Sequence, residues 1–132
     1  MGCYEILITD EFSAAHRLRM HDGTFEPLHG HNWRVEVTIL GPELDSAGLL
    51  ADFTELRPAL QKVTGELHDS CLNDHSAFAE VNPSTELVAR YIHDRLMPQI
   101  PPGARLAKVR VWETSNCAAA YIVVSNPTAD ER

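Results

Sequence analysis

The sequence has few cysteines and no motif among them. There are three cysteines, Cys3, Cys71 and Cys117. Because their number is odd and no two form a CxxC pair, a disulfide framework is not expected. No apolar run approaches the length needed to cross a membrane. The N-terminus also lacks the basic segment that begins a signal peptide. Together these absences predict a reduced, cytoplasmic protein that does not enter a membrane.

Basic side chains are also scarce. Lysine and arginine number 11 against 19 aspartates and glutamates, which gives a formal net charge of −8. Such a balance argues against a nucleic-acid partner, and an anionic ligand would need a local cationic pocket. With 132 residues, of which 44% are hydrophobic, the chain can form one domain with a small core. A core of this size favours self-association as a further source of stability.

Hydrophobic periodicity predicts an α+β domain with the element order ββααββ. Strands are expected at residues 3–16, 29–40, 105–113 and 117–124, and helices at 54–67 and 84–96. The last two strands are close enough to form a hairpin. These elements make one domain over residues 1–125, followed by a frayed tail at 126–132.

Three histidines lie where the first two strands would meet. His29 and His31 are two residues apart in a strand, so their side chains point to the same face. His16 ends the preceding strand and would lie opposite them in a hairpin. Three imidazoles with an open fourth position are typical of catalytic zinc. The alternative is an exposed or hydrogen-bonded pair without a metal. The other four histidines, His21, His68, His75 and His93, are expected to be ordinary surface residues.

Two acids are placed unusually. Glu113 ends a strand face that also carries Val109 and Val111. An acid on an apolar wall is costly unless it is paired, and a ligand edge with two parallel donors would pair with it well. Glu26 precedes His29 by three residues, in a loop that could overhang the histidines. In both cases the alternative is an acid that simply faces water.

Six short motifs follow one another in a recognisable order. They are FSAAH (12–16), LHGHN (28–32), DF (52–53), LN (72–73), NPST-E (82–86) and WET (112–114). Together they resemble the 6-pyruvoyltetrahydropterin synthase / 6-carboxytetrahydropterin synthase family over nearly the whole chain. The resemblance implies the tunnelling fold, or T-fold, in which an antiparallel sheet carries two helices on one face. It also implies a homo-oligomeric barrel, a trimer or hexamer, with active sites between subunits.

The resemblance further implies roles for individual residues. His16, His29 and His31 would hold Zn²⁺. Glu113 would anchor the 2-amino and N3 edge of a pterin, and the Ser84–Thr85 pair would touch the pterin from the neighbouring subunit. The implied partner is therefore a small-molecule pterin.

The loop before HGH departs from the best-known members of the family. These members have a cysteine four or six residues before the first histidine, where this chain has Phe25 and Gly23. A subgroup has ExxHGH instead, and Glu26 fits it. This resemblance implies a zinc-dependent lyase in which Glu26 is the general base. The lyase would cleave the side chain of 7,8-dihydroneopterin triphosphate to 6-hydroxymethyl-7,8-dihydropterin for folate synthesis. The alternatives are 6-pyruvoyltetrahydropterin or 6-carboxytetrahydropterin (queuosine) synthesis, and the missing cysteine argues against both.

A second departure concerns an Asp–His pair. The family reads LDHxxLN, in which the aspartate orients a catalytic histidine, whereas this chain reads LHDSCLN, with His68 before Asp69. Neighbouring residues on a helix point about 100° apart. The resemblance makes His68 and Asp69 candidate catalytic residues, but the inversion predicts that His68 turns away from the family's catalytic position. It also raises a third alternative, a non-catalytic pterin-binding or metal-binding paralogue.

Overall fold

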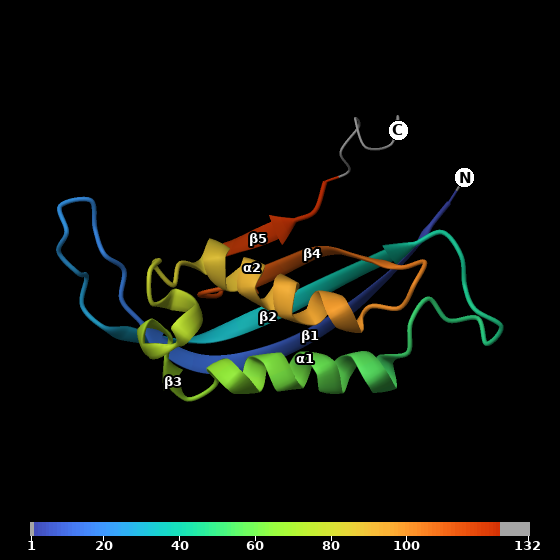
Figure 1. Cartoon of the computed structure of the whole chain (residues 1–132), viewed down its shortest axis with the longest axis horizontal. Coiled ribbons are helices and arrows are strands. Elements are labelled where there is room, and N and C mark those ends of the chain that lie inside the picture. The colour runs from blue at the N-terminus through green and yellow to red at the C-terminus, as the bar shows by residue number, and fades with distance from the viewer. Residues whose placement is uncertain (1, 125–132) are drawn as a thin grey trace.

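The computed structural model describes residues 2–124 as one five-stranded sheet with two helices on one face (Figure 1). The strand order is β3-β1-β2-β4-β5. The strands are β1 (Tyr4–His16), β2 (His29–Gly41), β3 (Ser70–Cys71), β4 (Arg105–Trp112) and β5 (Ala118–Ile122), and the helices are α1 (Phe53–Leu67) and α2 (Thr85–Leu96). The predicted α+β class is confirmed, and the predicted tail at 126–132 lies outside the described residues. Within residues 2–124, neither helix is long and apolar enough to span a membrane.

A long hairpin of β1 and β2 forms the centre of the sheet. The two strands pair without a break from Tyr4 opposite Gly41 to His16 opposite His29. Alternation along β2 buries Trp33 and every second residue through Ile39 beneath the helices. Since register follows from which face is buried, the same alternation sets the direction of the histidines at the end of the hairpin.

Both helices begin at side-chain caps. The Asp52 carboxylate accepts a hydrogen bond from the Thr54 N–H at 2.8 Å, and the Ser84 hydroxyl accepts one from the Leu87 N–H at 3.2 Å. The buried face of α1 consists of Leu56, Leu60, Val63, Thr64 and Leu67, and that of α2 of Val88, Ala89, Ile92, His93 and Leu96. Phe53 fits the same spacing but is 47% exposed, because it is the first residue of α1.

Two expectations about histidines are wrong. His93 is buried, with Nε2 3.3 Å from the Leu106 carbonyl oxygen, because the buried face of α2 extends to it. His68 and Asp69 do not lie on a helix, because α1 ends at Leu67. Asp69 adopts a positive φ of 56°. The chain then enters β3, a two-residue strand parallel to β1 that is too short for periodicity to reveal.

Candidate active site

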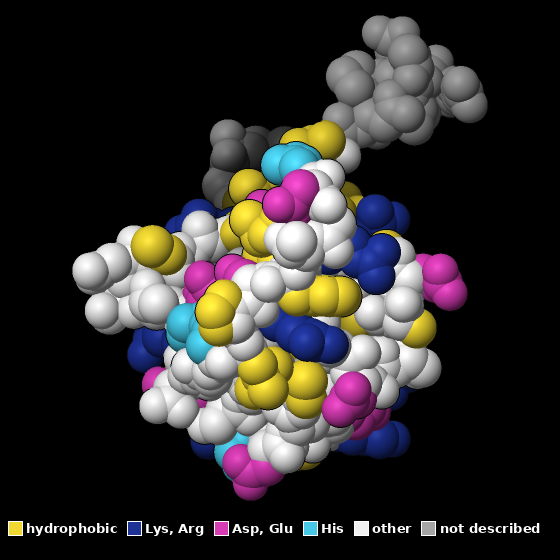
Figure 2. Space-filling model, turned by 90° about the vertical axis from the view of Figure 1, so that its left-hand side faces the viewer, with side chains coloured by type: hydrophobic (Ala, Val, Ile, Leu, Met, Phe, Trp, Pro, Cys, Tyr) yellow, Lys and Arg dark blue, Asp and Glu magenta, His cyan; other side chains and the backbone are white. Residues whose placement is uncertain are grey.

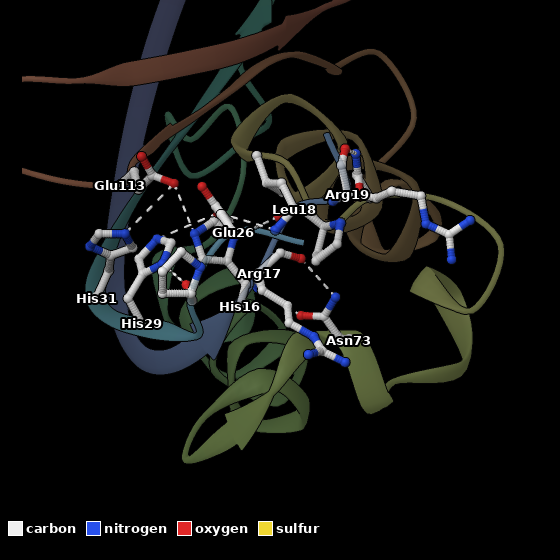
Figure 3. Close-up of polar contacts among 12 residues, drawn as sticks. His16, Arg17, Leu18, Arg19, Glu26, His29, His31, Asn73 and Glu113 are labelled. Carbon is white, nitrogen blue, oxygen red and sulfur yellow. Dashed lines mark hydrogen bonds and ion pairs between the residues drawn. The ribbon is translucent and has the colours of Figure 1, made fainter. Parts of the chain in front are cut away.

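The three predicted metal-binding histidines meet at the end of the β1–β2 hairpin (Figure 3). The ring centroids of His16 and His29 are 4.6 Å apart, and those of His29 and His31 are 4.8 Å apart. Trp33 packs edge-on against His16 and His31 at 4.8 and 5.5 Å, so an indole lies between the cluster and the rest of the core. The predicted convergence of these side chains is confirmed.

Backbone carbonyls fix the tautomers of two of the histidines. The Pro83 carbonyl oxygen lies 2.8 Å from His16 Nδ1, and the Pro27 carbonyl oxygen lies 2.8 Å from His29 Nδ1. A carbonyl oxygen can only accept, so each Nδ1 carries the proton and each Nε2 presents its lone pair. Metal-binding histidines are oriented in this way by a second hydrogen bond.

Glu113 extends from the end of β4 into the same cluster. Its Oε1 lies 3.1 Å from His16 Nε2 and 3.7 Å from His31 Nε2. His16 is fully buried, and among the described residues neither Nε2 atom has a hydrogen-bond partner. An imidazole lone pair that faces a carboxylate oxygen is repulsive unless a proton or a cation lies between them. These orphaned atoms therefore fit a bound cation.

The donor set suits zinc. The ligand atoms of His16, His29, His31 and Glu113 all lie within 4.8 Å of one another, and nitrogen and carboxylate oxygen are ordinary zinc ligands. Burial lowers the pKa of His31, and the neighbouring imidazoles lower it further, although the Glu113 carboxylate opposes them. A lowered pKa keeps His31 neutral near pH 7, which is the form that binds a metal. The sequence located the histidines but gave no sign that Glu113 faces them directly.

Glu26 lies at the rim of the cluster, as the loop spacing predicted. Its Oε1 is 3.8 Å from His29 Nε2 and accepts a hydrogen bond from the Leu18 N–H at 3.1 Å. The Glu26 N–H in turn donates to the Leu18 carbonyl at 3.0 Å. This reciprocal pair ties residue 26 to the chain just beyond His16 and holds the carboxylate beside the imidazoles (Figure 3).

His68 and Asp69 bond to β1 just before the β1–β3 pairing, on the side away from β2, and pair with each other. His68 Nδ1 accepts from the Ser13 N–H at 3.0 Å, and the Asp69 N–H donates to the Ser13 carbonyl at 2.7 Å. His68 Nε2 lies 3.3 Å from Asp69 Oδ2. Neither residue belongs to the histidine–glutamate cluster. Asp69 nevertheless lines an open hollow of about 370 Å³ that His31 also lines.

The Ser84–Thr85 pair directly follows Pro83, a residue that contacts the cluster through its backbone. Pro83, the residue before it, supplies the carbonyl that orients His16. Ser84 caps α2 through its hydroxyl oxygen. The NPST motif therefore positions both His16 and the start of a helix. Sequence reasoning did not assign Pro83 a role, because a backbone carbonyl leaves no residue signature.

Comparisons with known proteins agree with this geometry. The family described as 6-pyruvoyl tetrahydropterin synthase matches residues 5–122. The chain is 37% identical to a Bacillus subtilis 6-carboxy-5,6,7,8-tetrahydropterin synthase over 115 residues, 80% of this chain and 77% of that protein. It is 31% identical to a Pyrococcus furiosus dihydroneopterin monophosphate aldolase, covering 82% and 88% of the two chains. The Caenorhabditis elegans 6-pyruvoyl tetrahydropterin synthase superposes with a TM-score of 0.79 at 23% identity, covering 94% of this chain and 98% of its own, which confirms the T-fold. The protein therefore belongs to the 6-pyruvoyl tetrahydropterin synthase family.

Proposed function

We propose that this protein is a zinc-dependent lyase that cleaves the side chain of 7,8-dihydroneopterin triphosphate to give 6-hydroxymethyl-7,8-dihydropterin. The observation that carries the proposal is the position of Glu26. Its carboxylate lies 3.8 Å from a metal-site imidazole, in the loop where other members have a cysteine. None of the three cysteines joins the cluster. The similarity to a Pyrococcus furiosus protein named as an aldolase supports the same class of reaction.

His16, His29 and His31 would hold the zinc ion, which when bound supplies a Lewis acid that acidifies the side-chain hydroxyls of the substrate. Glu26 would take the proton of the C2′ hydroxyl. The C1′–C2′ bond then breaks, its electron pair moves into the C6–N5 imine of the ring, and an aldehyde leaves. The protonated Glu26 can return its proton to C1′, which forms the hydroxymethyl group. The hydrogen bond from the Leu18 N–H orients Glu26 for both transfers.

Glu113 would bind the pterin ring. A carboxylate can accept two parallel hydrogen bonds from the 2-amino and N3 donors, which holds the ring in one orientation. The Glu113 side chain is 27% exposed, so it is open to a ligand while one oxygen faces the imidazoles. Fixing the ring at this end would restrict the side-chain carbons to one orientation relative to the histidines and Glu26.

Residues from a second subunit would complete the site. Ser84 and Thr85 are proposed to touch the pterin of the neighbouring subunit. Asp69, which lines the hollow next to His31, and its partner His68 are proposed as further residues of the site. The sheet has free edges at β3 and β5, and unpaired edges favour assembly. A homo-oligomer is expected by light scattering at micromolar protein, and a monomer would contradict this part of the proposal. A cytoplasmic location stays a prediction.

A second candidate is 6-carboxy-5,6,7,8-tetrahydropterin synthesis, the activity for which the Bacillus subtilis relative is named. The deciding experiment is product analysis after zinc-loaded protein is incubated with 7,8-dihydroneopterin triphosphate. 6-Hydroxymethyl-7,8-dihydropterin as the product would support the proposal. A carboxy or pyruvoyl product would refute the aldolase assignment. Tight pterin and zinc binding with no product at all would favour a non-catalytic paralogue.

A further inference from the structure

The segment of residues 17–28, here called the arm, joins β1 to β2 and projects beyond the sheet (Figure 1). Two exposed arginines at its base face one aromatic ring. The guanidinium carbons of Arg17 and Arg19 lie 4.3 and 5.1 Å from the centroid of the Phe25 ring. Among residues 2–124, neither guanidinium lies within ion-pair distance of a carboxylate, whereas Arg34, Arg90 and Arg95 each have an acidic partner. Other arginines also lack an acidic partner among these residues, so what distinguishes Arg17 and Arg19 is that both guanidinium groups lie over the same Phe25 ring.

Two asparagines hold the backbone at these arginines. The Asn73 side chain accepts from the Arg17 N–H at 2.9 Å and donates to the Arg17 carbonyl at 2.8 Å. Asn82 does the same at Arg19, with distances of 2.8 and 3.0 Å. Each asparagine amide satisfies both the backbone N–H and the backbone carbonyl of one arginine, as a neighbouring strand would. The backbone positions from which both guanidinium groups extend are therefore fixed before a ligand arrives.

Leu18, the residue between the two arginines, is held by Glu26, from the other end of the arm. Leu18 exchanges two hydrogen bonds with Glu26, the proposed base. One short stretch after His16 thus connects the metal site, the base and the two arginines. In Figure 3 the arginine side chains extend away from Glu26 on the side opposite the histidines and Glu113.

A hollow of about 570 Å³ lies beside the arginines, and Asn73 and Asn82 also line it. At this end of the molecule, Figure 2 shows basic side chains next to hydrophobic ones. Two acids, Asp74 and Glu80, also line the hollow without reaching either guanidinium. They reduce the local positive charge, so attraction of an anion would depend on direct contact with the arginines and not on a broad field.

We infer that Arg17 and Arg19 form the binding site for the phosphate groups of the substrate. The inference rests on the proposed function, in which the substrate is a phosphorylated pterin. Guanidinium groups bind phosphate oxygens through paired hydrogen bonds, and stacking on Phe25 restrains their planes. The ring would lie at Glu113 and the phosphates at the base of the arm, with the side-chain carbons between them beside Glu26.

The direct test measures binding of inorganic tripolyphosphate to the zinc-loaded protein by calorimetry, which requires no turnover. Arg17→Gln and Arg19→Gln should each weaken binding at least about tenfold, as expected for a lost charge-assisted hydrogen bond. Glu80→Gln should tighten it by removing an opposing charge. Arg90→Gln is the matched control, because Arg90 also lies over an aromatic ring, Tyr121 at 5.4 Å, but on α2. It should leave binding unchanged.

Steady-state kinetics separate this inference from the proposed function. If the lyase is active, Arg17→Gln should raise KM for the triphosphate substrate at least about tenfold and leave KM for unphosphorylated 7,8-dihydroneopterin nearly unchanged. If no lyase activity is found, arginine-dependent tripolyphosphate binding would still support the site. Tripolyphosphate binding that is absent, or equal in wild type and both arginine variants, would overturn it. A change of oligomeric mass in both variants would instead assign the arginines to assembly.

Discussion

Removal of one metal-site histidine gives the sharpest test of the site. His29→Ala and His16→Ala each delete a proposed metal ligand, but they differ in what else they remove. The His29 side chain is 38% exposed, whereas His16 is fully buried and donates to the Pro83 carbonyl. His29→Ala should therefore affect stability mainly through the metal. His16→Ala should also destabilise the metal-free protein, by about 1–3 kcal/mol, because it leaves a buried carbonyl unpaired.

The size of the metal effect follows from linkage. Zinc at about 100 times its Kd stabilises the folded protein by about 2.7 kcal/mol. For 132 residues, an unfolding entropy of about 2.1 cal/mol/K per residue converts this to a rise of about 10 °C in Tm. The wild-type protein should show this rise when zinc is added to the chelated form. His29→Ala should lose most of it.

Calorimetry of chelated and zinc-loaded protein, with metal content measured by mass spectrometry, would check both expectations. His21→Ala is the control, because this exposed histidine lies outside the cluster. It should keep one zinc per subunit and the full rise in Tm. Full zinc occupancy and an unchanged rise in His29→Ala would refute the assignment of the metal site.

Three further predictions concern single side chains. Glu26→Ala should still bind zinc and pterin, but its kcat should fall by a factor of about 10²–10⁴. His68→Ala should lower kcat less. The reverse ranking of the two kcat values would make His68 the proton-transfer group. Glu113→Gln should weaken pterin binding at least about tenfold, because its amide offers a donor where the ring also donates. Retained zinc with lost pterin affinity in this variant would identify a ring anchor, whereas loss of both would identify a metal ligand. Ser84→Ala should lower the unfolding free energy by about 1 kcal/mol through loss of the α2 cap, and Ser84→Asp should restore it in denaturant melts.

Short-range sequence patterns predict the main strands and helices and the positions of the three histidines. The two-residue repeat of β2 fixes which face is buried, and the spacing of His29 and His31 follows from the same repeat. A hairpin of these two strands allows His16 to lie opposite His29, and the buried face of each strand limits the register. The caps of both helices are local as well, since a side chain two or three residues away satisfies each one.

Other features depend on contacts between distant segments. The sequence placed Glu113 on an apolar strand face, but only the β2–β4 pairing brings its carboxylate to within 3.1 Å of His16. The positions of His68 and Asp69 depend on where α1 ends and on hydrogen bonds to Ser13, 55 residues earlier. The tautomer of His16 is set by a carbonyl 67 residues away, and the hydrogen bonds to the backbone of the two arginines come from Asn73 and Asn82, in two separate segments. Local periodicity determines which face a side chain points to, whereas its partners are determined by chain closure over long loops, which no short-range pattern encodes.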